Sequence, residues 1–242
     1  MGKKYQREYQ VPYYESDLTG KMKLASLFNV ALQVSGEQSA ALERSDDYVK
    51  MLGVTWIVTE YQVTLERLPY FNERIVIETE ALSFNKFFCY RRFTIKDFSG
   101  NVLGVIDSTW CLLDLATRKL TSIKTEIIAP YMAQKVKTIQ KTQKIKAPEQ
   151  FLEKCYPVRF SDLDTNQHVN NAKYIGWLLD SLDYDFLIQH EPVKLHLKYI
   201  KEVQYGSTIT SRVERVDFLS YHEIVTDTLN AQAEIEWRYD EV

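Results

Sequence analysis

The second half of this chain repeats the first, and this internal repeat constrains the fold more than any other feature of the sequence. Sliding the sequence by 147 positions without gaps aligns similar residues. The aligned pairs are Tyr9 with Tyr156, Val11 with Val158, Tyr13 with Phe160, Glu15 with Asp162, Asp17 with Asp164, Ala25 with Ala172 and Leu32 with Leu179. Farther along, the offset falls to about 134, which aligns Val63 with Leu197 and Ile75 with Ile209. The two related halves indicate a duplication, with about 13 extra residues in the first copy around Glu43–Thr55.

Each copy reads as one strand, one long helix and then a run of strands. Apolar residues recur every three or four positions in Met22–Leu42 and in Asn171–Leu187, which predicts a helix packed on one face in each copy. The predicted strands, rich in Val, Ile, Thr, Tyr and Phe, are Tyr5–Tyr14, Val54–Leu65, Arg74–Leu82, Phe87–Lys96, Val102–Leu113, Tyr156–Phe160, Lys194–Tyr199, Thr208–Val216, Tyr221–Leu229 and Ala233–Tyr239. This order predicts an α+β fold, in which an antiparallel sheet wraps a helix in each half and the two sheets pair edge to edge.

A lysine-rich segment separates the two copies. Residues 117–154 are weakly periodic, contain Pro130 and Pro148, and carry a net charge of +6, which leaves −9 for the rest of the chain. The sequence therefore predicts three parts: an N-terminal half over residues 1–116, a basic linker over residues 117–154, and a C-terminal half over residues 155–242. The basic linker is either a solvated connection or a docking surface for an acidic partner.

Composition narrows the class of protein. The 242 residues are 45% hydrophobic and 26% charged, as in a globular protein with a sizeable core, and the net charge of −3 argues against a general nucleic-acid binder. No apolar run is long enough to span a membrane, and the first residues lack the apolar core of a signal peptide, so we expect a cytoplasmic protein. The three cysteines are scattered, which indicates neither a disulfide framework nor a zinc site.

Polar residues concentrate in Arg159–Tyr174, immediately before the second predicted helix. Its loop reads Asp162-Leu-Asp164-Thr-Asn166-Gln-His168, whereas the first copy reads Glu15-Ser-Asp17-Leu-Thr19-Gly-Lys21. The carboxylates persist, but lysine replaces histidine, and a lysine is a poor substitute for a neutral imidazole near pH 7. A functional site at this position would therefore lie in the second copy, while the first copy is degenerate.

Three interpretations of this loop compete. The first acidic and amide residues of the loop fit a calcium-binding loop. However, Gln167 stands where such a loop needs a glycine, and Lys173 stands where it needs the bidentate glutamate. A transition metal could use Asp162, Asp164 and His168, although no second histidine follows at helical spacing. The Asp and Asn residues could also simply cap the turn and the helix. The third interpretation must then explain three asparagines as well as the histidine.

The residues of Asp164–Trp177, Asp-x-Asn-x-His-Val-Asn-Asn-x-Lys-Tyr-Ile-x-Trp, closely resemble the signature of plant and bacterial acyl-ACP thioesterases. Trp56-Ile-Val-Thr and Leu-Pro-Tyr-Phe-Asn-Glu at 68–73 resemble that family's pattern in the first half. The resemblance implies two tandem hotdog domains, each a long helix wrapped by an antiparallel sheet. It also implies a hydrolase of fatty acid biosynthesis that acts on acyl carrier protein, needs no cofactor or metal, and holds the acyl chain mainly in the first half. The resemblance leaves open whether the protein forms a homodimer.

The family's active-site positions fall on Asp164, Asn166 and His168 of this chain. A further acidic position corresponds to Glu202, but the cysteine that follows it in the family is Val203 here. The resemblance therefore implies attack by water, or by a carboxylate, rather than by a thiolate. Glu202 would act as general base or nucleophile with His168, Asp164 would orient the loop, and Asn166 would hold the carbonyl or the water. Backbone amides near Val169–Asn171 would add positive potential at the oxyanion.

Two alternatives to this function remain: a thioesterase that acts on acyl-CoA, and an acyl-binding hotdog protein without turnover. Binding alone requires only an apolar tunnel, so the polar residues of the loop favour an enzyme. Leu27, Phe28, Ala31 and Leu32 of the first predicted helix are candidates for the wall of that tunnel.

Overall fold

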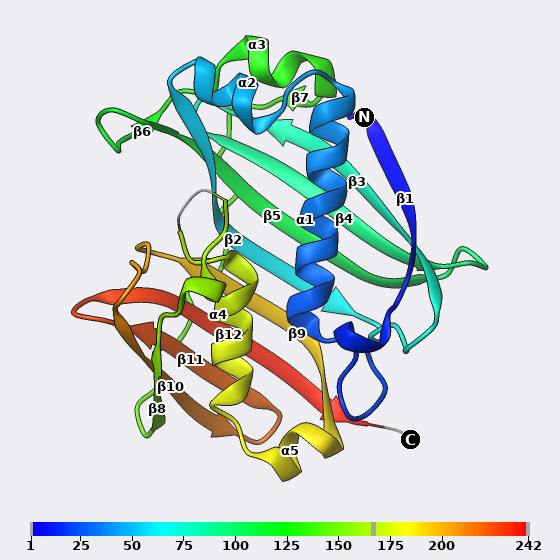
Figure 1. Ribbon diagram of the computed structural model, residues 1–242, viewed down its shortest axis with the longest axis vertical. Coiled ribbons are helices and arrows are strands. Elements are labelled where there is room, and N and C mark those ends of the chain that lie inside the picture. Colours follow the sequence, from blue (N-terminus) through cyan, green and yellow to red (C-terminus); the bar gives the residue numbers. More distant parts are fainter. Residues whose placement is uncertain (1, 166–167, 241–242) are drawn as a thin grey trace.

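The computed structural model describes residues 2–165 and 168–240, and these form a curved antiparallel sheet that packs against helices (Figure 1). The ten strands of its main path run in the order β1 (Lys4–Gln10), β3 (Arg74–Phe84), β4 (Phe88–Asp97), β5 (Val102–Asp114), β2 (Val54–Leu65), β9 (His190–Tyr199), β12 (Leu229–Tyr239), β11 (Leu219–Val225), β10 (Thr208–Val216) and β8 (Leu152–Pro157). The predicted α+β class and the edge-to-edge pairing of the two halves are confirmed, because β2 of the first half pairs with β9 of the second.

The β2–β9 junction lies on a local pseudo-twofold axis. Gln62 pairs directly with His196, and these two residues are also related by the offset of about 134 that aligns the strands of the two copies. On the opposite side of these strands, Tyr61 and Val63 face the core beside Leu195 and Leu197. The junction therefore joins both backbones and both cores.

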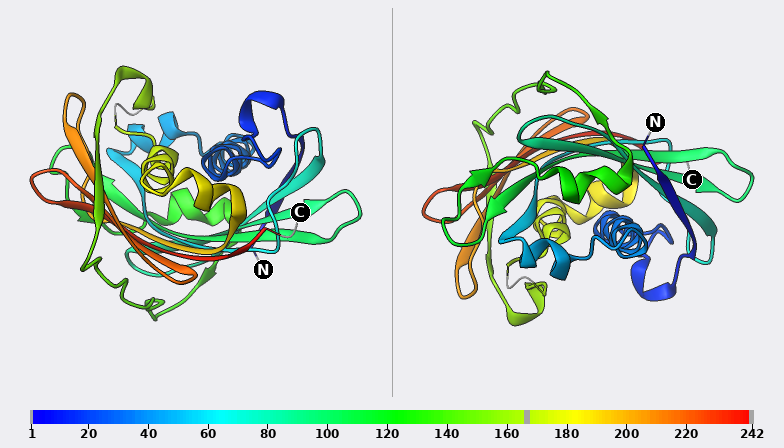
Figure 2. Two further views of the ribbon diagram at one scale, coloured as in Figure 1. Left: turned by 90° about the horizontal axis from the view of Figure 1, so that it is seen from below. Right: turned by 90° about the horizontal axis from the view of Figure 1, so that it is seen from above.

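Two long helices lie side by side on one face of the sheet (Figures 1 and 2). They are α1 (Leu24–Ala41) and α4 (Asn171–Asp180). Leu27, Val34, Ile175 and Leu178 are buried in one hydrophobic cluster that runs through both halves. Because neither half buries its helix separately, the two copies share one core.

The second helix is shorter than the sequence predicts. Asn171–Leu187 is not one helix: α4 ends at Asp180, and α5 (Tyr184–Gln189) begins after a break. The hydroxyl of Ser181 donates to the carbonyl of Leu178 at 2.6 Å, and the amide of Leu182 donates to Leu179 at 2.9 Å, so the last turn tightens. Asp183 is extended and stands as the N-cap of α5.

The extra residues of the first copy form a short helix that the periodicity did not reveal. In α2 (Asp46–Met51) the hydroxyl of Ser45 accepts a hydrogen bond from the amide of Tyr48, as an N-cap does. Val49 is buried in a second hydrophobic cluster with Val54, Leu112 and Ile127.

The basic segment between the copies begins on the helix side of the sheet, where the hydroxyl of Tyr131 donates to Ser39 of α1, and its later part crosses the opposite face (Figure 2). It contains β6 (Leu120–Thr121), α3 (Thr125–Ile128), the 3₁₀ turn η2 (Ala129–Tyr131) and β7 (Gln134–Lys135). The amide of Gln140 donates to the hydroxyl of Tyr90, and Lys198 donates to the carbonyl of Gln143, which fix the segment on the sheet. The division into residues 1–116, 117–154 and 155–242 stays a prediction.

Among the helices of residues 2–165 and 168–240, none combines the length and apolarity needed to cross a membrane.

Candidate functional site

The loop before α4 is closed on itself by backbone hydrogen bonds. The amide of Asp164 donates to the carbonyl of His168 at 2.8 Å, and the amide of Asn170 donates to Asp162 at 2.8 Å. Asn170 is also the N-cap of α4, because its side-chain oxygen accepts from the amide of Ala172. The sequence-predicted oxyanion donors include Asn170, but its amide is already bonded, so this residue is not available for that role.

The corresponding loop of the first copy makes the same backbone bonds. The amide of Asp17 donates to Lys21 at 2.9 Å, and the amide of Lys23 donates to Glu15 at 2.8 Å. Every donor and acceptor here differs by 147 positions from its counterpart in the second copy. The ungapped alignment of the two copies is therefore confirmed at the level of single hydrogen bonds.

Asp162 supports the loop from inside. Its carboxylate is fully buried, accepts from the amide of Arg159 at 2.9 Å and pairs with Lys173 at 2.9 Å. Burial alone would raise the pKa of Asp162, but the amide of Arg159 and the ammonium of Lys173 outweigh it and hold this pKa below its usual value. The Asp162 carboxylate thus stabilises the loop at the start of α4.

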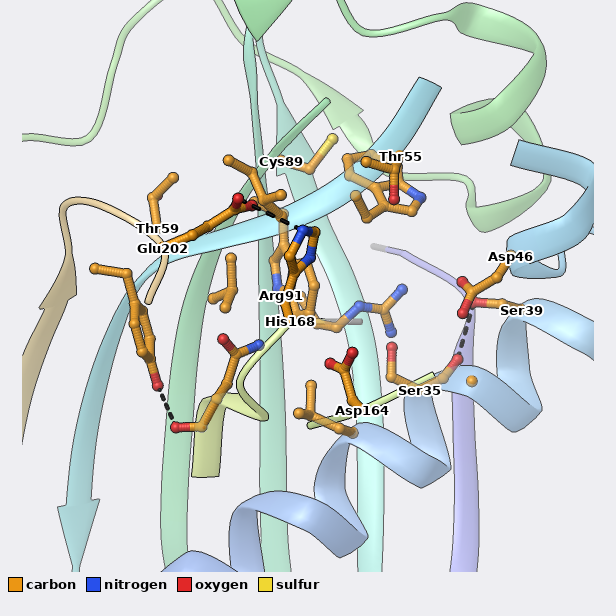
Figure 3. Close-up of a pocket in the computed structure, with 18 of the residues that line it drawn as sticks. Ser35, Ser39, Asp46, Thr55, Thr59, Cys89, Arg91, Asp164, His168 and Glu202 are labelled. Atoms are coloured by element: carbon orange, nitrogen blue, oxygen red, sulfur yellow. Dashed lines mark hydrogen bonds and ion pairs between the residues drawn. The ribbon is translucent and has the colours of Figure 1, made fainter. Parts of the chain in front are cut away.

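A cavity of about 420 Å³ lies between the two halves (Figure 3). Its walls in the first half come from α1, β2 and β4 and include Leu32, Ser35, Ser39, Trp56, Val58, Cys89 and Arg91. Its walls in the second half include Asp164, His168, Tyr174, Glu202 and Val203. Of the four candidate wall residues of the first helix, Leu32 lines this cavity, whereas Leu27, Phe28 and Ala31 are buried in the core.

The structure brings three of the four predicted site residues to this cavity. His168 Nε2 lies 3.5 Å from Glu202 Oε2, and each side chain is about one third exposed. Asp164 lines the same cavity from below the imidazole (Figure 3). Asn166, the fourth predicted residue, lies outside the described residues.

Backbone contacts anchor the loop that carries Glu202. The amide of Ile200 donates to the carbonyl of Asn230 at 2.8 Å, and the amide of Val203 donates to the hydroxyl of Tyr174 at 3.2 Å. Burial raises the pKa of Tyr174 to about 12, and the nearby charge of Glu202 adds to this increase. Tyr174 therefore stays protonated at neutral pH and serves as a fixed partner of the loop.

One cysteine reaches the cavity, at a position that the sequence did not single out. Cys89 of β4 is buried and lines the cavity, but burial raises the pKa of its thiol to about 12. Such a thiol is almost entirely protonated at neutral pH and is a poor nucleophile. Val203 is also buried, at the position where the family carries a cysteine.

Two arginines of the site were not predicted. Arg91 is buried in the cavity wall, where Nη1 donates to the side-chain oxygens of Gln38 at 2.6 Å and Thr79 at 2.7 Å. Burial lowers the pKa of Arg91. Arg118, which the sequence assigned only to the basic linker, donates from Nη2 to Glu202 Oε2 at 2.5 Å. No local pattern distinguishes either arginine from a surface residue.

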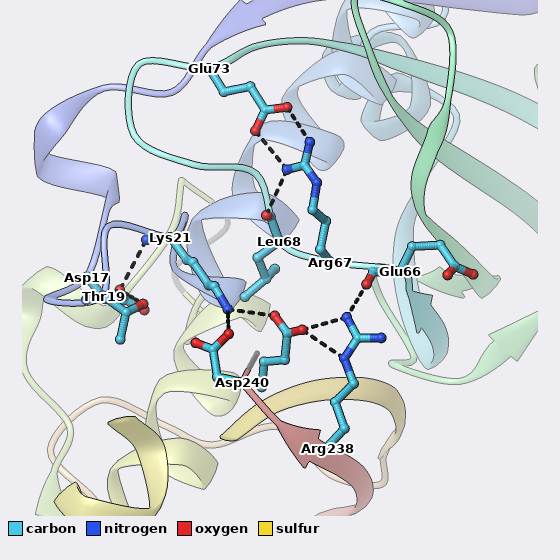
Figure 4. Close-up of polar contacts among 10 residues, drawn as sticks. Asp17, Thr19, Lys21, Glu66, Arg67, Leu68, Glu73, Arg238 and Asp240 are labelled. Carbon is cyan, nitrogen blue, oxygen red and sulfur yellow. Dashed lines mark hydrogen bonds and ion pairs between the residues drawn. The ribbon is translucent and has the colours of Figure 1, made fainter. Parts of the chain in front are cut away.

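The equivalent position in the first copy holds an ion network (Figure 4). Lys21, at the position of His168, pairs through Nζ with Glu191 at 2.8 Å and with Asp240, and Arg238 also pairs with Glu191. Leu68 occupies the position of Glu202 in the 134-residue alignment. Burial alone would lower the pKa of Lys21, but its bonds to Asp240 and Glu191 outweigh burial and raise it. In the first copy, the residue at the position of His168 thus stabilises the fold through buried ion pairs.

We predict that Lys21→Ala lowers the free energy of unfolding by about 3 kcal/mol, because it leaves buried carboxylates without their cation. Arg238 still compensates Glu191, which keeps the loss at the lower end of the range for buried pairs. Urea unfolding followed by circular dichroism measures the change. Lys4→Ala is the control: its pair with Glu78 has the same 2.8 Å length but an exposed lysine, so the loss should stay below about 1 kcal/mol. Equal losses in the two variants would contradict this account of Lys21.

Comparison with known proteins gives a consistent picture. The acyl-ACP thioesterase N-terminal domain matches residues 2–131, and the acyl-ACP thioesterase C-terminal domain matches residues 145–239. The chloroplastic oleoyl-acyl carrier protein thioesterase of Coriandrum sativum is 26% identical over 229 residues, which cover 87% of this chain. The chain spans 62% of the length of that relative.

Solved structures agree with this match. A structure described as an oleoyl thioesterase from Lactobacillus plantarum has a TM-score of 0.94 and 35% identity, and the alignment covers 98% of this chain and 97% of that one. The 12:0-ACP thioesterase from Umbellularia californica has a TM-score of 0.85 at 20% identity, with 98% of each chain covered, which shows a shared fold. The predicted tandem hotdog fold is thereby confirmed, and the chain belongs to the acyl-ACP thioesterase family.

Proposed function

We propose that this protein hydrolyses the thioester between a fatty acyl chain and acyl carrier protein, and releases the free fatty acid. One observation carries the proposal: His168 and Glu202, from two different elements, meet at a cavity that both halves enclose. The names of the relatives support the same reaction, since they include oleoyl- and palmitoyl-acyl carrier protein thioesterases. We keep the cytoplasm as the proposed location, while the plant relatives are named as chloroplastic.

In this proposal a water molecule attacks the thioester carbonyl. Glu202 takes a proton from that water as general base, and His168, 3.5 Å away, receives this proton and passes it to the leaving thiolate. Their separation of 3.5 Å is longer than a good hydrogen bond, as is common before substrate tightens a site. Asp164 orients the histidine loop, and we keep Asn166 as the proposed side chain that holds the carbonyl or the water.

A thiolate route is disfavoured by the chemistry of the cavity. Cys89 lines it, yet its raised pKa leaves almost no thiolate at neutral pH. Glu202 as the nucleophile stays an alternative to Glu202 as the base. We favour the base, because attack by water forms a tetrahedral intermediate that expels the thiolate directly, without a covalent acyl-enzyme.

We predict that His168→Ala and Glu202→Gln each lower kcat by about 10² to 10⁴, which is the usual contribution of general acid–base catalysis. Steady-state hydrolysis of acyl-ACP measures the loss, and circular dichroism confirms that each variant is folded. Cys89→Ala is the matched control in the same cavity, and it should retain kcat within about threefold because the thiol is protonated. Near wild-type hydrolysis by either of the first two variants, or loss in the control, would refute these roles.

The choice of carrier separates this proposal from its two alternatives. We predict that kcat/KM for acyl-ACP exceeds that for the matching acyl-CoA by about tenfold or more, because a protein carrier adds a steered encounter. An assay with matched pairs of substrates from C8 to C18 measures this ratio. A ratio near one would favour an acyl-CoA thioesterase, and binding without turnover would favour an acyl-binding protein.

The same assay locates carrier docking within the basic linker. Lys119 belongs to the exposed turn next to the cavity, whereas Lys141 and Lys144 are exposed where the linker crosses the sheet. We propose docking at the turn, since the carrier must deliver its acyl group to Glu202. Lys119→Glu should raise KM for acyl-ACP but not for acyl-CoA. The control is the double variant Lys141→Glu/Lys144→Glu, which changes twice the charge and should leave KM for acyl-ACP and for acyl-CoA unchanged. If instead the double variant raised KM for acyl-ACP and Lys119→Glu did not, docking would lie where the linker crosses the sheet.

A further inference from the structure

Glu202 receives its shortest contact from the other half of the molecule. Arg118 Nη2 lies 2.5 Å from Glu202 Oε2, the same oxygen that lies 3.5 Å from His168 Nε2. Arg118 lies on the turn between β5 and β6, at the start of the basic segment but within the residues 2–131 that match the N-terminal domain, while Glu202 follows β9 of the second copy. Both side chains are partly exposed, so the pair contributes little to stability, and its consequence is the orientation that it gives the carboxylate.

The turn that carries Arg118 is built to hold it in an uncommon conformation. Arg118 has a φ of 56°, in the left-handed region that non-glycine residues rarely adopt. The carboxylate of Asp114 accepts from the amide of Thr117 at 2.8 Å and from its hydroxyl at 2.9 Å, and the amide of Arg118 donates to the carbonyl of Asp114. Left-handed residues cost about 1–3 kcal/mol and persist where the surrounding bonds enforce them. The hydrogen bonds of the turn therefore fix the backbone from which the Arg118 side chain extends to Glu202.

Glu202 needs such a partner, because its backbone is held but its side chain is not. Asn230 and Tyr174 fix the backbone of residues 200–203. The side chain is about one third exposed, and within the described residues it pairs with Arg118 and His168. A glutamate has three rotatable bonds, and ordering such a side chain costs up to about 2 kcal/mol. The guanidinium offsets part of this cost before substrate arrives.

We propose that Arg118 is a positioning residue of the active site, which holds the Glu202 carboxylate in the orientation that faces His168. The inference rests on the proposed function of Glu202. It makes the active site a joint product of the two copies: the second supplies the reacting groups and the first supplies the residue that aligns them. Arg118 would therefore act on kcat rather than on the binding of the carrier.

The test compares Arg118→Ala and Arg118→Lys with wild type on acyl-ACP. We expect Arg118→Ala to lower kcat by about 10- to 100-fold with KM within about twofold, and Arg118→Lys to restore part of the loss by returning the charge. Added guanidinium, below denaturing concentration, should also raise kcat of Arg118→Ala by filling the vacated position. The control is Arg92→Ala, which breaks a similarly exposed pair with Asp107 on β5 and should leave kcat unchanged.

Two further readouts separate this inference from the role of Glu202. In a Glu202→Gln background, Arg118→Ala should cause little additional loss of kcat, because the two residues act together. A crystal structure of Arg118→Ala should show the Glu202 carboxylate farther than about 4 Å from His168 Nε2. An unmoved carboxylate, an unchanged kcat, or a loss seen only in KM would each overturn the positioning role. Full activity of Glu202→Gln would instead overturn the proposed function of Glu202.

Discussion

The pairing of β2 with β9 is the interaction on which the rest of the structure depends. It joins two sheets into one, and the Gln62–His196 pair places the pseudo-twofold axis on this seam. Because the seam also brings Tyr61 and Leu197 into one core, α1 and α4 are covered together rather than separately. The cavity between the halves follows directly, since its walls come from β2 and β4 on one side and from the loops around α4 and β9 on the other.

The loops before α1 and α4 make the same backbone hydrogen bonds but carry side chains with different roles. In the second copy the loop presents His168 to Glu202 at a partly exposed cavity, whereas in the first copy Lys21 is buried among carboxylates and Leu68 replaces the glutamate. Duplication makes such a division possible, because one copy can keep the reacting groups while the other stabilises the assembly. The first copy still contributes to the site through Arg118, which reaches across to Glu202.

The repeat and the succession of helices and strands along the chain could be predicted from the sequence, because period-two and helical patterns are local properties, whereas the order of the strands in the sheet depends on long-range pairing. Asp164, His168 and Glu202 were found through a motif, and the structure brings them to one cavity. The break at Ser181 was not predicted, because Leu182 and Phe186 continue the helical pattern across it. Cys89, Arg91 and Arg118 were also missed as cavity or site residues, because long-range folding alone places them there.

In the proposed mechanism, hydrolysis proceeds by water attack at the Glu202–His168 pair, without a covalent acyl-enzyme. Rapid-quench mass spectrometry of the intact protein during turnover of acyl-ACP tests it most directly. We predict that free fatty acid accumulates while the mass of the enzyme remains that of the unmodified chain at every time point. An enzyme heavier by one acyl group, with the group mapped to Cys89 or Glu202, would contradict the claim.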